Sequence, residues 1–294
     1  MAELSAEHKS ALSALIDFGY LAKNKKIDKL EKLDAEITRA ITRFQRHAAR
    51  PYRLPQDTPN MFHGKASGIL DAATLEEIAR WQQQGWKLPL GRFALVRLAQ
   101  GGKLRSDAAT AWTAIVAKVT GAGGTLEGPY GDTTRSFDFK AGAGASRHSF
   151  HYAGRAVDIQ QALAGGRGQR YYVAKDPQEG RMYWRIWCKV DASKGTAVKA
   201  KEKNYYEFYS RKELPMPAGS YIDLTKLIEE GGEFERIRAQ DGWEGSAKKQ
   251  EWWHFQYCVD KQATIQDELE LIGVSEAQLK QAGWLERDLD HAPG

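Results

Sequence analysis

Two short segments, far apart in the chain, contain the residues best suited to bind and use a metal ion. His151 and Asp158 belong to the segment SFHYAGRAVDI. Glu251 and His254 belong to EWWHFQYC. Two histidines and one carboxylate provide enough donors for a catalytic Zn²⁺ that keeps its fourth position for water, whereas a structural zinc is usually closed by four protein ligands. The sequence therefore predicts one zinc ion per chain, bound by His151, Asp158 and His254, with Glu251 beside it as a base.

Cysteine and the nearest other histidine are poor candidates for this site. Cys188 and Cys258 are the only cysteines, and no CxxC is present, which excludes a thiolate zinc finger and a scaffold of several disulfides. His148 lies three residues before His151, but a fourth protein ligand would shut out the water. We therefore expect that His148 does not bind the ion.

The residues between the first two ligands predict how the backbone presents them. Gly154 and Ala156 are small, which lets the backbone come close to its neighbours. The alternation of Val157 and Ile159 against Asp158 predicts a strand on which the carboxylate faces away from the two apolar side chains. One carboxylate is then expected to point into a cleft.

The backbone around Glu251 has two alternatives. The aromatic residues favour a strand, on which His254 and Trp252 share a face and Glu251 enters from a bend. On a helix, the three-residue spacing would instead put Glu251 and His254 on one face. In either case Trp252 and Trp253 are expected to be core aromatics beside the site.

These residues together resemble the zinc D,D-carboxypeptidase and D-Ala-D-Ala dipeptidase family of peptidoglycan peptidases. The family pattern is SxHxxGxAxD followed far downstream by ExxH, and the segment from Ser149 to Asp158 fills the first part without a gap. The segment from Glu251 to His254 fills the second part in the EWWH form of the dipeptidase branch. The resemblance covers about residues 106–260 and implies the same three zinc ligands with Glu251 as the catalytic base.

The resemblance also implies residues that handle the substrate. Arg135 lies roughly where the family places an arginine that grips a substrate carboxylate or stabilises the oxyanion. Arg147 and Arg155 lie nearer to the ligands in sequence and remain alternatives. Ser149 is expected to support the ligand loop or to contact substrate.

The expected fold class is α+β, with a small all-α domain before an antiparallel-sheet zinc-peptidase domain of the kind shared with hedgehog domains. The domain boundaries that we predict are a helical extension at 1–26, a helical domain at 27–100, the zinc-peptidase domain at 105–262 and a helical tail at 263–294. The 27–100 domain loosely resembles the three-helix peptidoglycan-binding domain of wall hydrolases, and a generic helical adaptor is the alternative.

Local patterns predict the individual elements. Apolar spacing predicts a helix over 27–48, with Leu30 and Leu33 on its buried face, and Asp71 is expected to cap a second helix. Ser106 or Asp107 is expected to cap a helix over 106–120, which the glycines at 121–124 end. Further expected elements in a strand-rich interval over 159–250 are strands at 170–176, 182–190 and 204–210 and a helix that starts at Asp223 or Thr225.

The leading functional interpretation is a zinc metallopeptidase that cuts a peptide bond next to a D-amino acid in bacterial peptidoglycan, as a D,D-carboxypeptidase or endopeptidase. It would act as a phage-type endolysin or an antibacterial effector. One alternative is an L-alanyl-D-glutamate endopeptidase of the same fold. Another is a non-catalytic zinc-containing wall-binding module, which the presence of Glu251 disfavours.

The charge of the chain and its first residues indicate which partners and which location to expect. A net charge of +5 and a pI of about 9.0 favour an anionic polymer such as the cell wall. The basic residues are dispersed and no nucleic-acid fold signature accompanies them, so nucleic acid is not an expected partner. The start of the chain lacks a charged region ahead of an apolar core. We therefore expect a monomer made in the cytoplasm without a signal peptide and without membrane insertion, which reaches the wall in the periplasm or outside after lysis or secretion.

Overall fold

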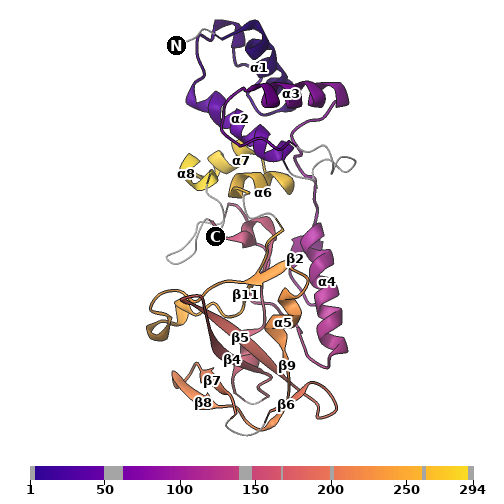
Figure 1. Cartoon of the computed structure of the whole chain (residues 1–294), viewed down its shortest axis with the longest axis vertical. Helices are drawn as coiled ribbons and strands as arrows, with labels where there is room; N and C mark the ends of the chain where they lie inside the picture. Colours follow the sequence, from indigo (N-terminus) through magenta and orange to yellow (C-terminus); the bar gives the residue numbers. More distant parts are fainter. Residues whose placement is uncertain are drawn as a thin grey trace. The chain divides into compact units, whose positions relative to one another are not determined.

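Helices and antiparallel strands make up the computed structural model, as the sequence predicts for an α+β protein (Figure 1). It describes residues 4–49, 62–138, 148–166, 168–198, 202–259 and 263–290. Contacts divide the chain into two units, Met1–Arg92 and Phe93–Gly294. None of the helices in the described ranges combines the length and the hydropathy needed to cross a bilayer.

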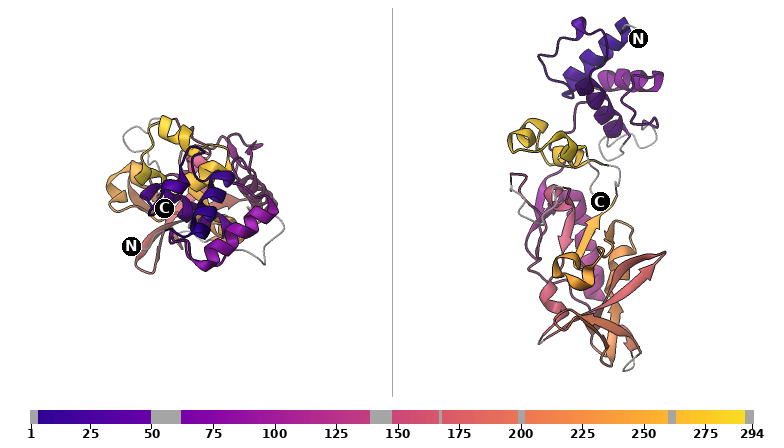
Figure 2. Two further views of the ribbon diagram at one scale, coloured as in Figure 1. Left: turned by 90° about the horizontal axis from the view of Figure 1, so that it is seen from above. Right: turned by 90° about the vertical axis from the view of Figure 1, so that its left-hand side faces the viewer.

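The first unit consists of the helices α1 (Ala6–Phe18), α2 (Ala35–Ala48) and α3 (Ala72–Gln84) and a 3₁₀ turn, η1 (Ile27–Lys29). The helices drawn from indigo to purple form one bundle in Figure 2. Their buried faces meet around Trp81, whose ring lies 5.0 Å from that of Phe44 and 5.7 Å from that of Phe18. Helix α1 therefore packs into the same core as α2 and α3.

Helix α2 begins at Ala35, eight residues later than the predicted start at residue 27. The cause is Asp34, whose carboxylate accepts a hydrogen bond from the Ile37 N–H at 2.8 Å and so caps the helix. Leu30 and Leu33 lie before this cap, although they still pack against the core. The predicted cap at Asp71 is confirmed, since its carboxylate accepts the Thr74 N–H at 2.9 Å.

Within the described residues, the second unit carries all the strands and the remaining helices. The strands are β1 (Leu95–Arg97), β2 (Lys103–Arg105), β3 (Ala156–Asp158), β4 (Tyr171–Gln178), β5 (Arg181–Val190), β6 (Thr196–Val198), β7 (Asn204–Glu207), β8 (Lys212–Pro215), β9 (Gly219–Asp223), β10 (Phe234–Arg236) and β11 (His254–Tyr257). The α-helices are α4 (Ser106–Gly121), α5 (Leu224–Glu229), α6 (Ile265–Leu271), α7 (Glu276–Gln281) and α8 (Glu286–Leu289). Four 3₁₀ turns join them, η4 (Phe150–Ala153), η5 (Gln161–Ala164), η6 (Trp243–Gly245) and η7 (Ala247–Lys249).

Every strand pair is antiparallel. A three-stranded sheet has the order β10-β11-β3, and a four-stranded sheet has the order β4-β5-β9-β6. The β1–β2 and β7–β8 pairs each form a separate two-stranded sheet, and β7 packs against β4. Helix α4 packs against α5 and β2, beside the sheets (Figure 1).

Most of the predicted elements of this unit are confirmed. The strands β4 and β5 match the predicted ones, while β7 ends at Glu207 rather than at residue 210. Helix α5 is capped by Asp223, as predicted, and the region after residue 263 is helical. The cap of α4 was predicted wrongly: Arg105 is the N-cap residue, because Asp107 lies inside the helix and binds the Arg105 guanidinium instead.

A buried ionic cluster joins α6 to the segment that carries the first two predicted ligands. The carboxylate of Glu268 accepts hydrogen bonds from Arg105 and lies 3.0 Å from Nη1 of Arg155, and all three side chains are at most 1% exposed. Arg155 also donates to the Tyr257 carbonyl at 2.6 Å. Two cations thus share one carboxylate between β2, β11 and the loop before β3.

Replacing Glu268 by glutamine tests this cluster. We expect the free energy of unfolding to fall by about 3 kcal/mol, because two buried guanidinium groups lose the charge that they share. Urea denaturation measures the loss. Glu286→Gln is the matched control on an exposed carboxylate of α8, 68% exposed, and should change stability by about 0.5 kcal/mol or less. Equal losses in the two variants would contradict the assignment.

Candidate metal centre

The register of the three-stranded sheet places two of the predicted ligands side by side. His254, the first residue of β11, lies directly opposite Asp158, the last residue of β3. Directly opposed residues of an antiparallel pair project their side chains to the same face. Val157 and Ile159 are fully buried in the core behind the sheet, while Asp158 lines an open pocket, as the alternation predicts.

His151 reaches the same point from the 3₁₀ turn η4. The hydroxyl of Ser149 caps this turn by accepting the His151 N–H at 3.3 Å. Gly154 ends it with φ of 63°, and a Cβ there would lie 2.8 Å from the backbone nitrogen of Arg105. The glycine is therefore required both for the left-handed turn and for the close approach to β2.

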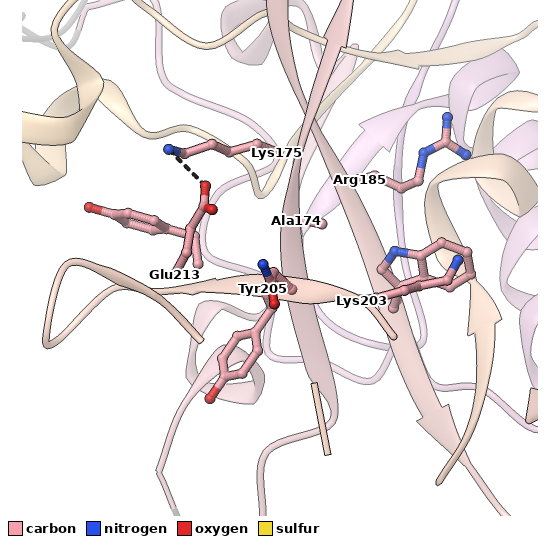
Figure 3. Close-up of a pocket in the computed structure, with 9 residues that line it drawn as sticks. Ala174, Lys175, Arg185, Lys203, Tyr205 and Glu213 are labelled. Carbon is pink, nitrogen blue, oxygen red and sulfur yellow. Dashed lines mark ion pairs between the residues drawn. The ribbon is translucent and has the colours of Figure 1, made fainter. Parts of the chain in front are cut away.

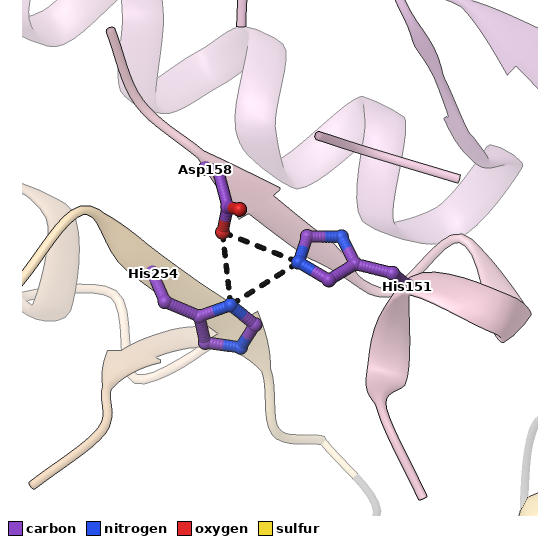
Figure 4. A group of neighbouring side chains, drawn as sticks. All are labelled: His151, Asp158 and His254. Carbon is purple, nitrogen blue, oxygen red and sulfur yellow. Dashed lines mark hydrogen bonds and ion pairs between the residues drawn. The ribbon is translucent and has the colours of Figure 1, made fainter. Parts of the chain in front are cut away.

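The three donor atoms form a compact triangle (Figure 4). Nε2 of His151 lies 3.2 Å from Oδ1 of Asp158 and 3.2 Å from Nδ1 of His254, and the third side measures 3.0 Å. Donors at about 2.0–2.1 Å from a tetrahedral zinc ion lie about 3.3 Å from each other. The triangle therefore fits a zinc ion with only a small expansion.

The electrostatics of the triangle favour an ionised carboxylate. Burial alone would raise the pKa of Asp158, but hydrogen bonds to His151 and His254 outweigh it and hold the pKa well below its usual value. An ionised carboxylate is the form that binds a cation. Because one oxygen faces both imidazoles, the group is already oriented as a ligand.

Glu251 lies in a turn just before β11, so the helical alternative is wrong. Its backbone has φ of 30°, and its carbonyl accepts the His254 N–H at 3.1 Å. The strand starts only at His254, so Trp252 is not on a strand face with that histidine. Trp252 is instead buried against Phe208, with ring centroids 5.6 Å apart, as expected of a core aromatic. A positive φ at a non-glycine residue is strained, and such strain is found most often at functional sites.

A pocket of about 500 Å³ opens over the triangle. Glu251, Arg135 and Ser149 all line it, together with Trp253. His148 lines it too, but it is not one of the three donors that converge. The interval between the two motifs contributes to the wall, through Gln161, Ile237 and Gln240.

Of the two candidate arginines that the structure describes, Arg135 lines the pocket and Arg155 does not. The Arg135 side chain is 27% exposed. Its backbone N–H donates to the His151 carbonyl at 3.0 Å. Arg155 is fully buried beneath the site in the cluster with Glu268. Arg147 lies outside the described residues.

Asp132 is a site residue that the sequence reasoning missed. Its carboxylate accepts a hydrogen bond from Nε of Arg135 at 2.6 Å and lies 3.9 Å from Nδ1 of His151. That Nδ1 is buried and has no hydrogen-bond partner among the described residues. Histidines that bind metals usually donate their second N–H to a carboxylate, which fixes the ring and strengthens it as a ligand. The signal was present in GDTTRSF, where an acid precedes Arg135 by three residues.

The backbone around Asp132 is tied directly to the ligands. The Asp158 N–H donates to the Asp132 carbonyl at 2.8 Å, and the Gly131 N–H donates to the Asp158 carbonyl at 2.8 Å. Gly131 and Asp132 therefore pair through their backbones with Asp158, the last residue of β3. These two backbone hydrogen bonds hold Asp132 next to Asp158.

In comparisons with known proteins, no known family, no curated protein and no solved structure matches the chain.

Asp132→Asn should weaken zinc binding by about 10- to 100-fold, because the amide lacks the charge that supports His151 as a ligand. Competition titration with a chromophoric chelator measures the affinity. Asp138→Asn, on an exposed carboxylate of the same segment, is the control and should leave the affinity unchanged. An unchanged affinity in Asp132→Asn would show that the carboxylate does not support the ligand.

Proposed function

We propose that the second unit is a zinc metallopeptidase that hydrolyses a peptide bond next to a D-amino acid in bacterial peptidoglycan. The observation that carries the proposal is the convergence of His151, Asp158 and His254 in an open pocket that Glu251 also lines. Three nitrogen and oxygen donors with room for a further ligand are typical of catalytic zinc. The likeness of both motifs to the D,D-carboxypeptidase and dipeptidase family supplies the substrate class and the zinc-peptidase fold.

The chemistry is divided between the ion and the chain. A zinc ion held by His151, Asp158 and His254 would polarise the scissile carbonyl and lower the pKa of water, so that hydroxide is available as the nucleophile near neutral pH. Glu251 takes the proton from the attacking water and passes it to the nitrogen of the leaving amine. The peptide bond breaks, and the products are a carboxylate and a free amine.

Arg135 is proposed to hold the substrate. Its guanidinium lines the pocket and keeps one edge on Asp132 through Nε, which leaves the terminal nitrogens to face a ligand. A planar fork of donors suits a carboxylate or a developing oxyanion. The hydroxyl of Ser149 is engaged by the His151 N–H, which favours support of the ligand turn as its role.

The helical first unit is proposed to bind the wall and so to hold the catalytic unit near its polymer. In this proposal the protein acts as an endolysin or an antibacterial effector, and peptidoglycan is the partner. The positive net charge of +5 supports an anionic partner.

Glu251→Gln should bind one zinc ion per chain and lose about 10²- to 10⁴-fold in hydrolysis, because the amide cannot accept the proton. Purified sacculi are digested with the zinc-loaded protein, with and without a chelator, and the released fragments are identified by mass spectrometry. Glu244→Gln, on an exposed carboxylate in η6, is the matched control and should digest normally.

The fragments also decide between the types of cut. Loss of one terminal alanine identifies a carboxypeptidase, and separation of cross-linked dimers identifies a D,D-endopeptidase. Release at the L-alanyl-D-glutamate bond identifies the alternative endopeptidase. Equal activity of Glu251→Gln and the wild type would sink the proposed mechanism, and no chelator-sensitive product from several wall types would leave a zinc-containing binding module.

A further inference from the structure

A second pocket of about 500 Å³ lies next to the metal pocket, and Arg135 lines both. We call it the basic pocket and define it by Arg97 of β1, Lys103 of β2, Thr134, Arg135 and the apolar residues Ile272 and Val274. The two pockets therefore share one guanidinium as a common wall. A ligand that occupies both pockets would have to pass Arg135.

The charge of the basic pocket is one-sided. Arg97, Lys103 and Arg135 line it, and no carboxylate does so among the described residues. Within the part of the chain that the structure describes, neither Arg97 nor Lys103 takes part in an ion pair, while Arg135 binds Asp132. The pocket thus presents cations whose counter-charge is not supplied by the described protein.

The strand register sets two of these exposed cations against each other. Arg97 and Lys103 lie directly opposite each other in the β1–β2 pair. Like charges at opposed positions of an antiparallel pair repel and destabilise it. A bound anion between them would turn this repulsion into two favourable contacts.

The other pocket of similar kind, in the four-stranded sheet, has a different design (Figure 3). There Lys175 points toward Glu213, with Nζ 2.9 Å from its carboxylate. Arg185 is held by both Asp176 and Asp223. Lys175 and Arg185 are therefore paired within the protein, whereas in the basic pocket only Arg135 is paired and Arg97 and Lys103 take part in no ion pair with a described residue.

The walls of the basic pocket are fixed by the fold. The Lys103 N–H donates to the Thr133 hydroxyl at 3.0 Å, and the Thr134 hydroxyl donates to the Lys103 carbonyl, so β2 and the Arg135 segment are joined. The Phe93 N–H donates to the Leu271 carbonyl at 2.8 Å, which anchors the start of β1 to α6. Arg97 and Lys103 are therefore carried by backbone that hydrogen bonds hold in place.

We infer that the basic pocket binds an oxyanion group, a carboxylate or a phosphodiester, of an extended wall polymer whose scissile bond lies in the metal pocket. This inference rests on the proposed function and adds the form of the substrate to it. The substrate is a polymer segment that spans Arg135, not a free dipeptide. Binding energy from a remote anionic group then holds the chain in place for cleavage.

The test measures binding in the absence of hydrolysis. In the Glu251→Gln background, the double variant Arg97→Glu/Lys103→Glu is compared for binding to purified sacculi by co-sedimentation. The double change keeps a like-charge pair across β1–β2 and reverses only its sign. We expect the dissociation constant to rise at least about tenfold, with a weaker dependence on salt, because two cationic contacts are lost.

Two further variants keep the result interpretable. Arg181→Glu/Lys194→Glu makes the same change of net charge at exposed positions away from the pocket and should bind as the background does. Arg97→Glu alone places opposite charges across β1–β2, so it should fold at least as stably while binding less well. This single variant keeps the test valid if the double variant does not fold.

Chemically modified sacculi identify the oxyanion. Amidation of the stem-peptide carboxylates should abolish the difference between pocket and control variants if the group is a carboxylate. Removal of phosphodiester polymers with hydrofluoric acid should do so if it is a phosphodiester. Equal binding of the pocket and control variants to unmodified sacculi would overturn the inference.

Failure of the inference and failure of the proposed function are distinguishable. If wild type hydrolyses sacculi but the pocket variants bind and digest like the controls, the peptidase stands and the basic pocket has no part in it. If no hydrolysis is found but the pocket variants lose binding, the pocket binds the wall and the proposed reaction is wrong.

Discussion

The carboxylate of Glu268 is the constraint on which the rest of the second unit depends. It is buried with two guanidinium groups, and one of these, Arg155, lies between the two ligands of the first motif. The other, Arg105, starts α4. A buried charge group of this kind tolerates little displacement, because moving one member weakens ion pairs that water cannot replace in the core. The loop that carries His151 is therefore held from behind by a helix more than a hundred residues later in the chain.

The front of the site depends on a different kind of interaction. Backbone pairing between β3 and β11 sets His254 against Asp158, and a slip by one residue would turn His254 into the core. Buried Val157 and Phe255 oppose each other in the next position and fix that register through packing. Hydrophobic burial on one face thus determines where the donors stand on the other.

Local sequence was sufficient where local interactions decide the structure. The strands β4 and β5 follow from their aromatic and β-branched content, and the cap at Asp71 follows from the residue type alone. The start of α2 did not follow, because the apolar spacing of Leu30 and Leu33 continues past the point where Asp34 captures the first N–H groups. Periodicity reports which side chains are buried and does not mark where hydrogen bonding begins.

The donors of the candidate site could be chosen from residue types and spacing, whereas the buried support from Glu268 could not. Asp132 binds Arg135 only three residues further on, so GDTTRSF held a local signal for it. Glu268 instead binds an arginine 163 residues away, and no local pattern distinguishes such an acid from an exposed one. The role of Glu268 became visible only when the fold had brought the partners together.

The placement of the last helices has a consequence for how the site forms during synthesis. Trp284 packs on Tyr152 of the ligand turn, with ring centroids 5.2 Å apart, and its indole N–H donates to the Phe137 carbonyl at 2.7 Å. The ribosome must therefore complete nearly the whole second unit before His151 has its full support. Until then the turn that carries His151 lacks the contacts that Trp284 makes with Tyr152 and Phe137.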